Sequence, residues 1–179
     1  MNREEFEQFV MNCGKDILRF CRLTTGDRET GDELYQDTML ILLEKGARLD
    51  PVQNKKSYAL SVAILLWKNK KRKYANRRRL MPVDSMERVE EESGLDPPDD
   101  SAASPDEHLL REDERHTVQK VVAELPEKYR LPIQLFYAAD MSVQEISDIM
   151  RIPEGTVKSR MSKARSLLKK ELEELGYDR

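Results

Sequence analysis

The sequence predicts an all-α protein in which an acidic, flexible linker joins two small helical domains. Helix-forming residues dominate the 179-residue chain, which contains only 7 glycines. No run of alternating β-branched residues is typical of a strand. An acidic stretch with Pro and Ser separates two parts of the chain that carry apolar side chains at helical spacing. The expected domains therefore span residues 1–80 and 105–179, and residues 81–104 form the linker.

Three helices are expected in the first domain. The first helix runs from Arg3 to Leu23 and ends before Gly26. The second begins at a capping box in which Thr30 pairs with Glu33, and it continues to Lys45, with Gly46 as its stop. Apolar spacing on the first helix predicts an inward face made of Phe6, Val10, Cys13, Ile17 and Cys21.

The third helix is expected from Val52 to Arg78, because Asp50-Pro51 precedes it and Pro is tolerated at a first helical position. Its first half is apolar and its second half, from residue 68, is densely cationic. The net charge of −3 hides this segregation, because acidic residues crowd 84–114 while basic residues crowd 68–79 and 158–170. Local charge therefore favours nucleic-acid binding although the whole chain is acidic.

The second domain is expected to begin with a helix over Pro105–Glu124, started by a capping box of Ser104 with Glu107. Pro126 ends that helix, and another follows over Glu127–Ala139. The side chains expected to face inward on these two helices are Leu109, Val118, Val121, Val122, Leu125, Leu131, Leu135 and Phe136.

Two short helices around a tight turn are predicted between Ser142 and Arg165. Ser142 and Glu145 have the spacing of a capping box, and Pro153 disfavours helical geometry before it, so the first helix should stop near Arg151. Gly155 tolerates the unusual backbone angles of a turn. The second helix begins near 154 and extends to about Leu175. Its inward stripe is expected to be Val157, Met161, Ala164 and Leu168.

The other side of this last helix carries cations and hydroxyls, namely Lys158, Ser159, Arg160, Ser162, Lys163 and Arg165. This pattern predicts a helix-turn-helix whose second helix enters the major groove of DNA. Cations suit phosphates, while hydroxyls and Arg suit base edges. A solvated surface helix is the alternative, which the cap, the turn and the small Ala164 make less favourable.

Several function classes find no support in the sequence. There is no glycine-rich nucleotide loop, no catalytic set of residues and no cluster at metal-ligand spacing, so we expect no enzyme, cofactor or metal. Cys13 and Cys21 lie two helical turns apart, about 12 Å, too far for a disulfide. They are expected to be free thiols of a cytoplasmic protein. We expect no signal peptide and no membrane-spanning segment.

Five motifs resemble region 4 of bacterial sigma factors, most closely the extracytoplasmic-function (ECF) group of the sigma-70 family. They are Leu125-Pro-Glu-Lys-Tyr-Arg130, Gln134-Leu-Phe-Tyr137, Met141-Ser-Val-Gln-Glu-Ile146, Ile152-Pro-Glu-Gly-Thr-Val-Lys-Ser-Arg160 and Lys163-Ala-Arg165. Upstream, Asp32-Glu-Leu-Tyr-Gln-Asp-Thr-Met39 is similar to the core-binding helix of region 2, and Tyr58 to Arg79 is similar to its promoter −10 helix.

The resemblance implies a sigma factor that binds core RNA polymerase at the β′ clamp helices and the β flap, recognises promoter DNA and melts it. An anti-sigma factor is a further partner common in the family. The implied core-binding residues are Glu33, Leu34, Gln36 and Asp37. The implied −10 contacts are Lys68, Lys71, Arg72, Tyr74, Asn76, Arg77 and Arg78. The implied −35 contacts are Thr156, Lys158, Ser159, Arg160, Ser162 and Lys163.

The −10 helix departs from the family pattern. Leu65 stands where the family often has Asn, and Asn69 where it often has Asp, so base preference at the −10 element stays open. Tyr74 and Asn76 lie inside the cationic run, and we hypothesise that they help to hold an unstacked base. The alternative is that Tyr74 packs against its own domain. Trp67 is expected to be a core residue.

The linker and the overall assignment each leave an alternative. A chain of about 25 residues reaches roughly 80–90 Å when extended, enough to join promoter elements on the order of 70 Å apart. Its acidic residues either form a solvated tether or enter a positively lined polymerase channel. The competing assignment is a stand-alone helix-turn-helix regulator with an N-terminal sensor or dimerisation domain. The second cationic helix favours the sigma factor, because a sensor needs a pocket instead. The activating signal and the regulon are not encoded in any motif.

Overall fold

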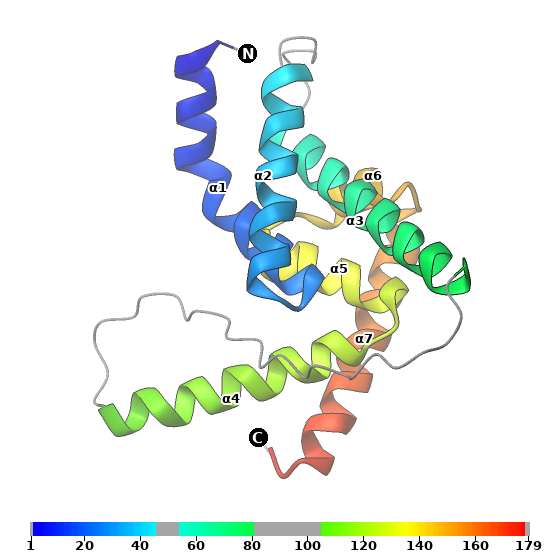
Figure 1. Ribbon diagram of the computed structural model, residues 1–179. Coiled ribbons are helices and arrows are strands. Elements are labelled where there is room, and N and C mark those ends of the chain that lie inside the picture. The colour runs from blue at the N-terminus through cyan, green and yellow to red at the C-terminus, as the bar shows by residue number, and fades with distance from the viewer. Residues whose placement is uncertain (1, 46–53, 81–104, 178–179) are drawn as a thin grey trace. The chain divides into compact units, whose positions relative to one another are not determined.

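The computed structural model describes residues 2–45, 54–80 and 105–177, without the side chains of residues 78, 80 and 105–114. Within these ranges the chain forms seven helices and no strand, as Figure 1 shows, which confirms the predicted all-α class. The chain divides into two compact units, Met1–Gly94 (unit 1) and Leu95–Arg179 (unit 2). The expected linker 81–104, the Gly46 stop, Asp50-Pro51 and the Ser104 cap lie outside the described residues.

Helix α1 (Arg3–Thr25) opens unit 1 and has a defined cap at each end. Asn2 forms a capping box with Glu5, in which the Glu5 amide donates to the Asn2 side chain at 2.8 Å. At the other end Gly26 adopts a left-handed conformation, with φ 76°, and donates its amide to the Arg22 carbonyl. The helix therefore continues two residues past the predicted end at Leu23, up to the glycine that can reverse the backbone.

Helix α2 (Arg28–Lys45) begins earlier than the sequence predicted, because Asp27 and not Thr30 caps it. The Thr30 amide donates to the Asp27 carboxylate at 2.6 Å. Hydrogen bonds with Thr30, first from its side chain and then from its amide, lower the pKa of Asp27 from its ordinary value. The contribution of the Asp27 cap to stability is thus present above the pKa of Asp27 in the unfolded chain and is lost as the pH falls through its pKa in the folded chain. Glu33 is therefore not used in a cap, which leaves its side chain for other contacts.

Helix α3 (Lys55–Leu80) also starts at a side-chain cap that the sequence prediction missed. The amides of Lys56 and Ser57 donate to the Asn54 side chain at 3.0 and 3.3 Å. Lys56 additionally pairs with Asp16 of α1 at 2.6 Å, which ties the start of α3 to α1. The cationic half of α3 follows the anchored half without a break in the helix.

The core of unit 1 joins all three helices. Ile17, Phe20 and Cys21 of α1 and Leu42 of α2 are fully buried, as are Ala59, Leu60 and Ala63 of α3. Each large apolar side chain buried in this way stabilises the fold by about 1.5–3 kcal/mol relative to its exposed state. Phe6, Val10 and Cys13 are only half-buried, so the inward face predicted for α1 is partly wrong. The face is rotated toward Phe9 and Phe20, because α1 packs against both α2 and α3.

Unit 2 is built around its last helix. Helices α4 (Pro105–Glu124), α5 (Glu127–Tyr137) and α6 (Val143–Met150) each pack against α7 (Glu154–Glu174). The predicted stripe of α7 is confirmed at Val157, Met161 and Ala164, which are buried, while Leu168 is half-buried. On α4 the prediction holds for Val121 and is wrong for Val118, which is 39% exposed. Leu109 falls among the undescribed side chains.

Both cysteines are free, as expected. Cys21 is fully buried and Cys13 is half-buried. Burial raises the pKa of the Cys21 thiol to about 12, so this thiol is unreactive at neutral pH. In the described ranges, no helix is long and apolar enough to cross a bilayer. The same residues contain no group of His, Cys, Asp and Glu that is arranged to hold a metal ion.

The crossing of α1 and α2 predicts a sharp effect at Gly31. A Cβ at this position would lie 2.6 Å from the Cα of Arg22, which is a backbone atom and cannot move aside. Gly31→Ala should lower the free energy of unfolding by about 1–3 kcal/mol through overpacking, as measured by urea denaturation. Gly155→Ala is the control, because a Cβ there meets no atom within 4 Å. An equal response of the two variants would contradict the close packing of α1 on α2.

Candidate nucleic-acid and polymerase interfaces

The turn between α6 and α7 is held by specific bonds. The Ser142 amide donates to the Glu145 carboxylate at 2.8 Å, and the Glu145 amide donates to the Ser142 hydroxyl at 3.2 Å, so the predicted capping box is confirmed. α6 ends at Met150 with Arg151 as its C-cap, which agrees with the predicted stop near Arg151. The Ser147 hydroxyl then donates to the Ile152 carbonyl at 2.6 Å, which closes the turn.

The residue that reverses the backbone in this turn is Arg151 rather than Gly155. Arg151 has φ 54° and ψ 48°, a left-handed conformation that is uncommon for a residue with a side chain. Gly155 lies in the first turn of α7 and has no positive φ, so the role predicted for it is wrong. Sequence reasoning assigned the backbone reversal to glycine because glycine tolerates unusual backbone angles. In the structure, the Arg151 amide donates to the Ser147 carbonyl and the Ser147 hydroxyl donates to the Ile152 carbonyl, and these two bonds hold the reversal at Arg151.

The predicted −35 residues lie along the first turns of α7. Lys158, Ser159, Ser162 and Lys163 are exposed, while Thr156 and Arg160 are half-buried. The Ser159 hydroxyl donates to the Thr156 carbonyl at 3.0 Å. Lys158 pairs loosely with Glu154 at 3.6 Å, one turn away. The exposed members therefore form a continuous polar surface on the side of α7 away from its buried stripe.

Arg165 is held in place by an aromatic residue of α5. Its Nε donates to the Tyr137 hydroxyl at 3.2 Å, and its guanidinium lies 5.9 Å from the centroid of the Tyr137 ring. Tyr137 is neutral, so this contact orients the guanidinium without cancelling its charge. By contrast, Lys169 and Lys170 each pair with a glutamate one turn away. Sequence reasoning did not predict this contact of Tyr137 with Arg165, because nothing in the spacing of α5 indicates a partner on α7.

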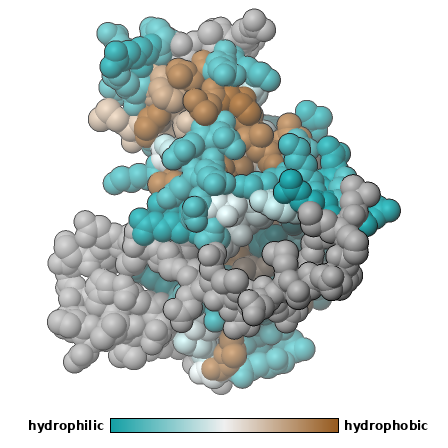
Figure 2. Space-filling view, viewed as in Figure 1, coloured by the Kyte–Doolittle hydropathy of each residue, from teal (hydrophilic) through white to brown (hydrophobic). Residues whose placement is uncertain are grey.

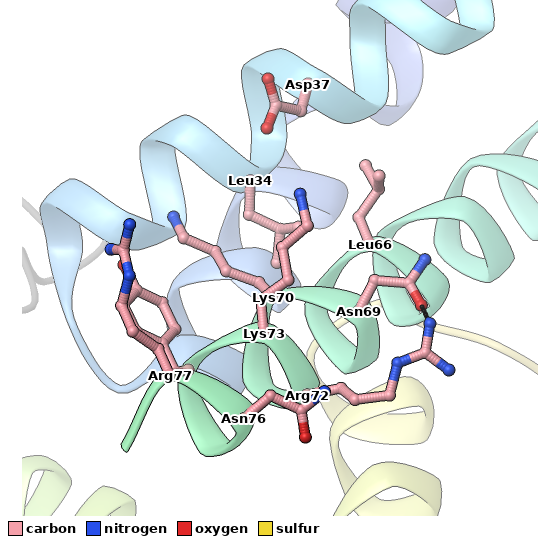
Figure 3. Close-up of a pocket in the computed structure, with 10 residues that line it drawn as sticks. Leu34, Asp37, Leu66, Asn69, Lys70, Arg72, Lys73, Asn76 and Arg77 are labelled. Carbon is pink, nitrogen blue, oxygen red and sulfur yellow. Dashed lines mark hydrogen bonds between the residues drawn. The ribbon is translucent and has the colours of Figure 1, made fainter. Parts of the chain in front are cut away.

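In unit 1 a hollow of about 1140 Å³ lies between α2 and the cationic part of α3. Figure 3 shows the long side chains of Lys70 and Lys73 extending from α3 toward α2, and Arg72 bonded to Asn69. The lining combines apolar side chains with four cations and two amides. It comprises Leu34, Asp37, Leu66, Asn69, Lys70, Arg72, Lys73, Tyr74, Asn76 and Arg77.

Residues implied to bind the polymerase and residues implied to bind −10 DNA thus meet in one place. Leu34 and Asp37 line the hollow from α2, and Arg72, Tyr74, Asn76 and Arg77 line it from α3. Leu34 is buried, with only 2% of its surface exposed, whereas Glu33, Gln36 and Asp37 are exposed. Lys68 and Lys71 are exposed but do not line the hollow, and the side chain of Arg78 lies outside the described residues.

The aromatic residues of α3 differ in exposure. Tyr74 is 56% exposed, which leaves more than half of its side chain accessible to a partner. Trp67 is half-buried, and its indole nitrogen is buried without a hydrogen-bond partner among the described residues. Leu65, the residue that departs from the family pattern, is 60% exposed and is therefore not a core residue.

Two features of unit 1 were missed by sequence reasoning. Lys70 of α3 pairs with Glu33 of α2 at 2.7 Å, although the residues lie 37 positions apart. The hydrogen bond that Lys70 donates to the Glu33 carboxylate raises the pKa of Lys70, and the charge of Asp37 adds to this rise. Met11, Leu40 and Leu43 are large exposed apolar side chains on α1 and α2, and Figure 2 shows apolar surface over these helices. α2 contains more leucines than one buried face can hold, and this excess is the sequence feature that could have predicted the exposed apolar surface.

Comparison with known proteins places both units in one family. Residues 9–78 match the family described as Sigma-70 region 2, and residues 115–168 match Sigma-70, region 4. The chain is 38% identical over 71 residues to the ECF RNA polymerase sigma factor SigW of Bacillus subtilis. That match covers 40% of this chain and 38% of SigW. It is 35% identical over 72 residues to the RNA polymerase sigma-H factor of Pseudomonas aeruginosa, covering 40% of this chain and 37% of that protein.

Two solved structures share the fold. One is the sigma factor RpoE in complex with the anti-sigma factor NepR from Bartonella quintana, with a TM-score of 0.74 at 21% identity. That match covers 98% of this chain and 99% of RpoE. The other is CnrH in complex with the cytosolic domain of CnrY, with a TM-score of 0.66 at 18% identity, covering 96% and 90%. Sigma factors are transcription initiation factors and not enzymes. The chain belongs to the sigma-70 family, and ECF sigma factors are among the relatives that it resembles.

Proposed function

We propose that this chain is the initiation subunit that directs core RNA polymerase to promoters and opens the DNA there. The observation that carries this proposal is the presence of one exposed cationic helix on each unit, α3 in the region 2 match and α7 in the region 4 match. A single cationic helix suits a simple regulator. Two of them on separately folded units suit a protein that contacts one promoter at two elements.

Unit 1 would bind the β′ clamp helices through the exposed residues of α2. Glu33, Gln36 and Asp37 present carboxylates and an amide on one surface of the helix. Leu34 beneath them packs toward α3 and fixes the orientation of that surface. A partner that supplies cationic or amide side chains would complement it. The alternative of an N-terminal sensor domain is less well supported, because α3 presents a second DNA-type surface instead.

Unit 2 would dock α7 in the major groove of the −35 element and contact the β flap. Exposed Lys158 and Lys163 suit phosphates, and Ser159, Arg160 and Ser162 can reach base edges. The buried stripe of α7 and the turn at Arg151 hold this surface in one orientation. Arg165, oriented by Tyr137, adds a fixed cation next to the groove-facing residues.

Promoter opening requires no covalent chemistry. An unstacked base costs a few kcal/mol, which a site that stacks it and bonds its edge can offset. The hollow between α2 and α3 offers an exposed ring at Tyr74 and an amide at Asn76, surrounded by cations that suit the backbone. We therefore assign −10 strand binding to this hollow and its cationic rim, in a protein that works in the cytoplasm.

An anti-sigma factor is a further proposed partner. The solved structure of RpoE contains the anti-sigma factor NepR, and that of CnrH contains the cytosolic domain of CnrY. In this chain the exposed apolar side chains Met11, Leu40 and Leu43 form a surface that such a partner would cover.

In vitro transcription tests the proposed function directly. The purified chain is added to core polymerase on genomic DNA, and the start sites are mapped. The proposal requires new start sites that share two upstream elements about two duplex turns apart. Core polymerase that gains no start sites, together with a chain that binds DNA alone at defined operators, would favour the stand-alone regulator.

Lys163 is expected to be a phosphate contact. Lys163→Ala should weaken promoter binding and reduce the slope of log affinity against log salt by about 1, because one cation no longer displaces counterions. Lys170→Ala is the matched control, since Lys170 lies further along α7 and pairs with Glu174. An altered sequence preference with an unchanged slope would instead mark Lys163 as a base reader.

Tyr74 is expected to act in DNA opening. Tyr74→Ala should slow open-complex formation, measured by permanganate reactivity of the melted strand, while leaving polymerase binding intact. Loss of one base–aromatic stack corresponds to about 1–3 kcal/mol, or roughly 5- to 150-fold in the opening equilibrium. Tyr74→Phe should retain most of the activity. Opening at the wild-type rate in Tyr74→Ala would remove Tyr74 from the mechanism.

A further inference from the structure

Lys70 occupies a position between the two surfaces of unit 1 that have different proposed partners. Its ammonium lies 2.7 Å from the Glu33 carboxylate, and 30% of the lysine side chain and 58% of the glutamate side chain are exposed. Asp37, one turn further along α2, adds a second negative charge nearby and lines the same hollow. In the free chain Lys70 therefore neutralises the acidic surface of α2 rather than extending the cationic surface of α3.

The pair cannot keep this arrangement with both partners bound. A cationic side chain that approaches Glu33 also comes close to Lys70, and like charges at such a distance repel. A DNA phosphate near α3 attracts Lys70 away from Glu33 in the opposite direction. Each partner thus weakens the ion pair between Lys70 and Glu33. Once the pair is weakened, Lys70 can contact DNA and Glu33 can contact the polymerase.

We propose that Lys70 is exchanged between partners: it covers Glu33 in the free chain, and a polymerase surface that presents Lys or Arg to Glu33 and Asp37 releases it to a DNA phosphate. This inference rests on the proposed function and adds a coupling between its two binding events. By linkage, polymerase binding raises affinity for DNA through Lys70, and DNA binding raises affinity for polymerase by the same factor. Exposed ion pairs of this kind limit the effect to roughly two- to fivefold.

The exchange predicts that removing either member of the pair tightens binding of the partner that the other member contacts. In the full chain, Lys70→Gln should bind core polymerase two- to fivefold more tightly, because Glu33 and Asp37 lose their internal counterion. Glu33→Gln should bind a forked −10 DNA two- to fivefold more tightly without polymerase at low salt, because Lys70 is released. That gain should disappear in the double variant Glu33→Gln, Lys70→Gln. A residue with a merely structural role would weaken both affinities.

Two matched variants separate the exchange from a general change of charge. Lys73→Gln removes the same charge one turn along α3, where the described residues show no ion pair, and it should not tighten polymerase binding. Glu44→Gln removes a carboxylate from the far end of α2 and should change DNA affinity less than Glu33→Gln. Equal effects of Lys70→Gln and Lys73→Gln on polymerase affinity, or of Glu33→Gln and Glu44→Gln on DNA affinity, would overturn the exchange. A wild-type chain that binds neither core polymerase nor DNA would overturn the proposed function itself.

Discussion

The anchorage of α3 is the constraint on which the proposed activity of unit 1 depends. The C-terminal half of this helix is a run of cations that repel one another and contribute little burial of their own. Its N-terminal half contains Ala59, Leu60 and Ala63, all fully buried, and the two alanines let the backbone come close to its neighbours. The Asn54 cap and the bond of Lys56 to Asp16 fix its start. The helix therefore continues from a rigid base into a cationic segment that its own packing does not cover.

Unit 2 also holds a cationic helix in a fixed position, but by packing along one side of that helix. Its cationic helix α7 is held along one side by Val157, Met161 and Ala164 and is set in direction by the turn at Arg151. The remaining side is free to carry charge because it contributes nothing to the core. In both units the division between buried stripe and cationic side is what a helix needs to present phosphate-binding groups without losing its fold. The Tyr137–Arg165 contact extends this logic, since a neutral ring orients a cation while preserving its charge.

The sequence was sufficient for the fold class, for most helix bounds and for the α7 stripe, because these depend on local periodicity and on caps such as Ser142–Glu145. It was insufficient where two candidates competed for one role. Asp27 caps α2 in place of Thr30, and Arg151 reverses the turn in place of Gly155. The Lys70–Glu33 pair and the hollow around it join distant segments, so no spacing rule indicates them. Most of the described residues implied by family resemblance lie on exposed surfaces, whereas Leu34 is buried and Thr156 and Arg160 are half-buried. The roles of all of them depend on partners.

The central claim is that two cationic helices on separate units contact one promoter at two places when polymerase holds both. Hydroxyl-radical footprinting of a promoter found by start-site mapping tests this claim most directly. With core polymerase and the chain together, we expect two protected patches about two duplex turns apart, and with the chain alone at the same concentration we expect neither. A single protected patch with polymerase, or both patches without it, would contradict the account.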